Sequence, residues 1–155
     1  MMLEIDGKSY ETKFNYGFAK RLMKDYGTEN VDGFSHLINQ IIDSDPMALV
    51  NGYRYSLDTK SLPSDEKVAD ALEAAGVFDK GEEAFSELFK AVKSAGFLTL
   101  QLNLYVSSKE NVVEDAKKVL ANLSNEEDKQ GAEIDLAAAE TSLARIKKAI
   151  KKLSK

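Results

Sequence analysis

The chain has no cysteine and a single histidine, His36. Without cysteine it cannot form disulfides, thiolate-bound zinc sites or iron–sulfur clusters, and it lacks a cysteine nucleophile. One histidine has neither a second zinc-binding side chain nor an evident partner for general acid–base catalysis. We therefore expect no metal, no cofactor and no catalytic role for His36.

Phosphate-binding and calcium-binding patterns are also missing. Gly76 and Gly81 flank a helix boundary and do not follow a strand, as the glycines of a phosphate loop do. Asp43 and Asp45 precede Pro46 where a calcium loop would have glycine. No Gly-x-Ser-x-Gly elbow of a serine hydrolase is present. The sequence therefore predicts a binding protein and not an enzyme.

Targeting and membrane signals are absent too. The opening MMLEIDGKSY has no basic stretch followed by an apolar core, and no apolar run approaches the roughly 20 residues that span a bilayer. The 155 residues are 43% apolar and 30% charged, which fits one folded domain with an appended helix. We expect a cytoplasmic protein that does not contact membranes.

The charge is unevenly distributed. The net charge of −5 argues against general nucleic-acid binding, although residues 145–155 hold six basic side chains and no acid. These cations match the dipole at the end of a helix, or could meet the acidic surface of a neighbouring copy. Nucleic-acid binding through 147–155 is the weaker alternative.

Residues 1–14 have the pattern of a β-hairpin. Leu3 and Ile5 alternate with polar neighbours, and Asp6-Gly7 is a favoured two-residue turn. A lone hairpin is marginally stable, so its apolar face must rest on helices.

Helical patterns follow the hairpin, and four of them are preceded by a polar residue that could cap the helix. The predicted caps are Asn15, Asp45 before Pro46, Ser64, and a capping box formed by Asp79 and Glu82.

Residues 97–106 are ambiguous. Leu98, Leu100, Leu102, Leu104 and Val106 alternate strictly, which is typical of a strand, because residues at period two cannot all face one side of a helix. Leucine is a poor strand former, however, and helical patterns flank the segment. We favour a helix; as a strand, the segment would join the N-terminal hairpin.

The C-terminal part reads as an acidic link at 124–131 and an amphipathic helix at 132–155. Its apolar residues are spaced by threes and fours over about three heptads. They are Leu136, Ala139, Leu143, Ile146, Ile150 and Leu153. The predicted fold is α+β and mainly α, with an N-terminal hairpin packed on a helical bundle over residues 1–123, followed by the link and the C-terminal amphipathic helix.

Two groups of residues are candidates for partner binding. Tyr16 and Phe18 flank the stripe of the first helix, so that at least one of them is expected at the surface, where aromatics often anchor interfaces. Alternatively, both pack against the hairpin. The second group is the C-terminal stripe, which either binds a partner or folds back on the core. Its candidate residues are Leu136, Leu143, Ile146, Ile150 and Leu153.

Several of these N-terminal features occur together in a known family. The turn Ile5-Asp6-Gly7-Lys8 precedes an aromatic-containing strand, the next helix ends in Tyr26-Gly27, and a later segment reads DPMALVNGYRYSL. Over roughly residues 1–95 this pattern resembles the tail assembly chaperones of long-tailed phages and prophages of Gram-positive bacteria.

The resemblance implies a role in tail morphogenesis. Such chaperones bind and solubilise the tape measure protein, recruit tail tube subunits, and are not part of the mature virion. It therefore implies the tape measure and tail tube proteins as partners and the cytoplasm of the bacterial host as the location. A homo-oligomer is expected separately, from the C-terminal stripe and its basic residues. The alternative is a self-assembling structural adaptor of a phage or prophage particle.

Overall fold

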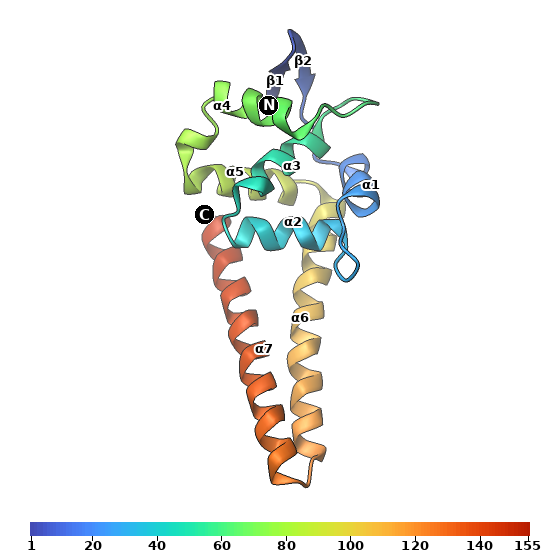
Figure 1. Ribbon diagram of the computed structural model, residues 1–155, viewed down its shortest axis with the longest axis vertical. Coiled ribbons are helices and arrows are strands. Elements are labelled where there is room, and N and C mark those ends of the chain that lie inside the picture. The colour runs from blue at the N-terminus through green and yellow to red at the C-terminus, as the bar shows by residue number, and fades with distance from the viewer. The chain divides into compact units, whose positions relative to one another are not determined.

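The computed structural model describes all 155 residues, and 72% of them are helical. The elements in chain order are β1 (Met2–Ile5), β2 (Lys8–Glu11), α1 (Tyr16–Asp25), α2 (Gly33–Ile42), α3 (Pro46–Ser56), α4 (Asp65–Ala74), the 3₁₀ turn η1 (Phe78–Lys80), α5 (Glu82–Lys93), α6 (Gly96–Asn122) and α7 (Glu126–Leu153) (Figure 1). The chain forms two compact units. Unit 1 is Met1–Gln101 with Leu153–Lys155, and unit 2 is Leu102–Lys152.

The N-terminal hairpin is present as predicted. β1 and β2 pair antiparallel around Asp6-Gly7, whose φ angles of 54° and 71° are those of a tight two-residue turn. Leu3 and Ile5 are buried, and β1 packs on α4. The predicted fold class, mainly α with a hairpin on helices, is therefore confirmed.

Helices α1 to α4 each begin after a residue whose side chain accepts a hydrogen bond from a free N–H group of the helix. Asn15 Oδ1 accepts a hydrogen bond from Phe18 N–H (3.1 Å), and Asp45 Oδ1 accepts one from Met47 N–H (2.9 Å). Ser64 Oγ caps α4 with a longer contact of 3.4 Å. The helices bury large apolar side chains, including Phe18, Leu22, Phe34, Leu37, Ile38, Ile41, Leu72, Leu88 and Phe89.

The capping box predicted at Asp79 and Glu82 is wrong. Gly81, with φ of 56°, is the N-cap of α5, and no side chain caps this helix. Asp79 instead lies inside the 3₁₀ turn η1, which connects α4 to α5. Its backbone is therefore not in the extended conformation that an N-cap residue normally has.

Residues 97–106 are helical, as favoured from the sequence, and form the start of one continuous α6. Leu98 and Leu102 are buried, whereas Leu100 and Leu104 are each 54% exposed. The alternation therefore reflects a helix that is apolar on opposite sides, and it does not mark a strand.

The acidic segment 124–131 is mostly helical, in contrast to the expected link. Asn125 Oδ1 accepts a hydrogen bond from Glu127 N–H (2.8 Å), so that it caps α7. Glu126, Glu127 and Asp128 then occupy the first turn, where carboxylates are favoured by the helix dipole. Only residues 123–125 connect α6 to α7.

Candidate partner-binding surface

The titratable side chains form no cluster that could bind a metal ion. No three side chains of the metal-binding types come together. The ring of His36 packs against that of Tyr26, with the ring centroids 4.9 Å apart, and Tyr26 forms a short hydrogen bond to Gln40. Burial is the main cause that raises the pKa of Tyr26. These residues stabilise the α1–α2 contact, and the functional candidates are surfaces.

The two predicted aromatic anchors lie in different environments. Tyr16 is 60% exposed, and its ring contacts Phe97 edge-on at 5.2 Å between centroids. Phe18 is fully buried and packs against Phe14 at 5.1 Å. Tyr16 is therefore accessible to a partner, whereas Phe18 belongs to the core of unit 1.

The five predicted residues of α7 differ in their exposure. Ile146 and Leu153 are buried, the latter within unit 1, and Leu136, Leu143 and Ile150 are half-buried.

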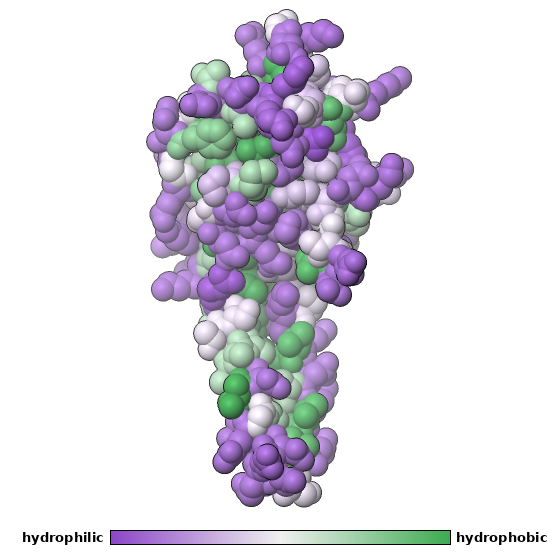
Figure 2. All heavy atoms as spheres, viewed as in Figure 1, coloured by the Kyte–Doolittle hydropathy of each residue, from purple (hydrophilic) through white to green (hydrophobic).

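In unit 2, α6 and α7 run side by side as an antiparallel hairpin (Figure 1). Lys147 Nζ lies 2.6 Å from Glu110 Oε1, and Val113 and Ile146 are buried. Two helices can bury only the strip between them, so apolar side chains at its margins stay accessible to a third helix. Hydrophobic residues accordingly interrupt the polar surface of the α6–α7 hairpin (Figure 2).

Further exposed apolar residues lie mainly along α6, and they were not among the predicted partner-binding residues. Leu100, Leu104, Val112 and Val119 are 54–56% exposed, and Ile134 of α7 is 70% exposed. A signal was available, because residues 94–108 contain no charged side chain in a chain that is 30% charged. A solvent-facing helix normally carries charges on its outer side.

The exposed residues of α6 share one side of that helix. Leu100 and Leu104 are four residues apart, which places them one above the other. At about 100° per residue, Val112 and Val119 fall within roughly a third of the circumference from Leu100. We call Leu100, Leu104, Val112 and Val119 the α6 apolar row. A row of this kind suits an amphipathic helix lying along it.

The phage tail assembly chaperone protein family, TAC, matches residues 2–105, about two thirds of the chain. No curated protein and no solved structure matches the chain. None of the helices has the length and hydropathy that a bilayer-spanning segment needs. The match includes the hairpin, α1 to α5 and the first part of the α6 apolar row, and the chain therefore belongs to the family of phage tail assembly chaperones.

Proposed function

We propose that this protein binds and solubilises the tape measure protein in the host cytoplasm, recruits tail tube subunits, and is not part of the mature virion. The observation that carries the proposal is the α6 apolar row, which leaves four large apolar side chains more than half exposed on a single helix. Large apolar side chains that stay exposed along one side of a helix are candidates for binding a partner. The partner chemistry that fits it is an amphipathic helix.

The row supports weak, repeated binding. Full burial of a leucine or valine side chain contributes about 1.5–3 kcal/mol, so covering the exposed half of one residue contributes about 1 kcal/mol. Four such residues supply about 4 kcal/mol before the cost of association is subtracted. A single copy would hold a helix weakly, and many copies along one long helical partner would hold it firmly through avidity.

Residues beyond the row extend the proposed surface. Tyr16 lies at the surface of unit 1, and the half-buried Leu136, Leu143 and Ile150 lie along α7. Phe18, Ile146 and Leu153, also predicted as partner-binding residues, are buried in this structure and would act by supporting the exposed ones.

The proposal is tested by co-expressing the tape measure protein with matched variants. Leu104→Glu places a carboxylate in the row, and Asn103→Glu places the same group at the adjacent exposed residue on another side of α6. We expect Leu104→Glu to leave the tape measure protein insoluble and Asn103→Glu to behave like the wild type, with circular dichroism confirming that both fold. Equal solubilisation by both variants would refute the proposal.

A second measurement separates the proposal from the structural adaptor. Mass spectrometry of purified particles should find none of this protein. Its presence in constant copy number per particle would favour the adaptor and overturn the chaperone role.

A further inference from the structure

The strand β1 has one free edge. It pairs only with β2, in a register that places Ile5 opposite Lys8 beside the two-residue turn. The pair next to such a turn exchanges both hydrogen bonds, and bonded and non-bonded pairs then alternate. The hydrogen bond from Thr12 N–H to Met1 O (2.9 Å) continues this alternation.

The alternation decides which backbone groups point outward. Residues 1, 3 and 5 direct their N–H and C=O groups to β2, and Met2 and Glu4 direct theirs to the opposite side. Neither Met2 nor Glu4 has another backbone hydrogen bond. An edge of this kind can be satisfied by another extended chain.

A groove follows this free edge. Two hollows of about 200 and 220 Å³ share Glu4, Ala71 and Ala74 as lining residues, so they form one continuous depression. Every other lining residue belongs to β1, its turn, α4 or the C-cap of α4, and none belongs to β2. The groove therefore lies on the side of β1 that faces away from its partner strand.

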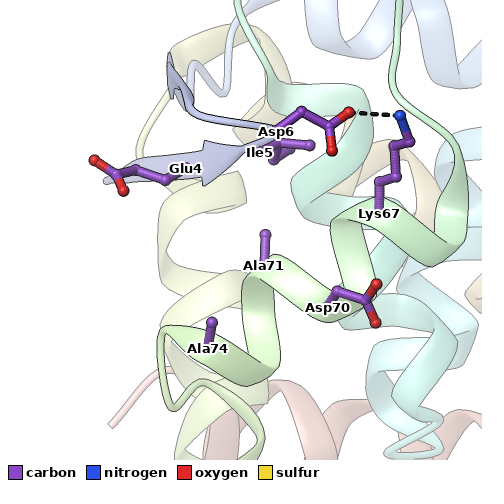
Figure 3. A pocket seen from close by; sticks show the side chains of 7 residues that line it. All are labelled: Glu4, Ile5, Asp6, Lys67, Asp70, Ala71 and Ala74. Atoms are coloured by element: carbon purple, nitrogen blue, oxygen red, sulfur yellow. Dashed lines mark hydrogen bonds and ion pairs between the residues drawn. The ribbon is translucent and has the colours of Figure 1, made fainter.

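The side chains of α4 leave room beside β1. Ala71, Ala74 and Ala75 line the groove, and Ala71 and Ala74 point toward β1 (Figure 3). A strand added to β1 would lie about 4.8 Å from it. Methyl groups permit that approach, whereas longer side chains would fill the space.

The negative charge of the groove favours a basic segment as its ligand. Lys67, its only cation, is bound to Asp6 (Figure 3). Glu4 and Asp70 also line the groove and form no ion pair, so it carries unbalanced negative charge. A basic segment would be attracted to it. Two β1 edges of separate copies would instead bring together two sets of unpaired carboxylates.

We propose that the free edge of β1 adds an extended, lysine- or arginine-bearing segment of a partner protein as a third strand. Alternate side chains of that segment face the alanines of α4, and the basic side chains between them lie on the side of Glu4. Backbone hydrogen bonds to Met2 and Glu4 fix its register. The site is separate from the α6 apolar row, so it does not depend on the proposed tape measure binding.

The test uses a labelled hexapeptide that alternates lysine and valine, with a glutamate–valine peptide as the control ligand. Ala74→Lys fills the groove and places a second cation in it. Ala121→Lys makes the same substitution at an exposed position of α6. We expect the basic peptide to bind the wild type and Ala121→Lys equally and to bind Ala74→Lys at least tenfold more weakly, while the acidic peptide does not bind.

Hydrogen exchange distinguishes strand addition from simple charge attraction. Binding should slow exchange of the Met2 and Glu4 amides. Binding without this protection, equal binding to Ala74→Lys, or no saturable binding would each overturn the proposal. So would a wild-type dimer in light scattering that Ala74→Lys dissociates, because it would assign the edge to a second copy. None of these outcomes affects the Leu104→Glu test.

Discussion

Gly33 lies so close to the backbone of α1 that any larger residue at this position should destabilise the protein. A Cβ atom added at Gly33 would lie 1.9 Å from the carbonyl oxygen of Leu22 and 2.5 Å from its carbon. Both are backbone atoms of α1, so no rotamer change relieves the clash. The same carbonyl accepts a hydrogen bond from Tyr26 N–H (2.9 Å), and displacing it would weaken the end of α1.

Gly33→Ala should therefore be severely destabilising. Overpacking of a well-packed site costs about 1–3 kcal/mol, and a backbone obstacle places this case at the upper end, about 3 kcal/mol. For a chain of this length, 1 kcal/mol corresponds to about 2–4 °C in melting temperature. We expect a loss of about 6–12 °C.

Gly131→Ala is the matched control. Gly131 lies inside α7, and an added Cβ there meets nothing within 4 Å. Because alanine has the higher helix propensity, this variant should gain about 0.5–1 kcal/mol. The same substitution is thus expected to have opposite signs at the two positions.

Urea unfolding measures both effects. Five of the six tyrosines precede Gln101, so tyrosine fluorescence reports mainly on unit 1, and circular dichroism at 222 nm reports on all helices. If Gly33→Ala unfolds at the wild-type midpoint, the close approach of α1 and α2 is not as described.

Three further outcomes are expected. Gly7→Val should destabilise unit 1 by about 1–2 kcal/mol in urea unfolding, because a β-branched residue is strained at φ of 71°; an unchanged midpoint would show that the turn is not left-handed. Asp45→Ala should cost about 1 kcal/mol in the same assay by removing the cap of α3, and Asp45→Asn should retain most of it. Burial raises the pKa of Tyr53 above its ordinary value of 10.0. The stability that this group contributes is therefore present below pH 10 and is lost as the pH rises through the folded pKa. Melting temperatures that stay constant from roughly one unit below to one unit above the ordinary pKa would contradict this.

Only part of the candidate surface could be predicted from the sequence. The C-terminal stripe was found because threes-and-fours spacing is a local property of one helix. The α6 apolar row was not predicted, because the alternating leucines alone do not indicate which of them other segments cover. Leu98 and Leu102 face the interior and Leu100 and Leu104 do not, which depends on where other segments pack. The uncharged run 94–108 was the available clue.

The sequence by itself determined the local elements of this protein. Asp6-Gly7 specified the hairpin because its turn needs positive φ angles, and Asn15 and Asp45 specified helix starts because their oxygens satisfy free N–H groups. The shared N-terminal pattern also led to the family.

Tertiary structure decided what lies between elements. It buried Phe18 and exposed Tyr16, placed Gly33 against the Leu22 carbonyl, and left the β1 edge open above the alanines of α4. These features depend on contacts between residues distant in the chain, and single-element periodicity carries no information about such contacts.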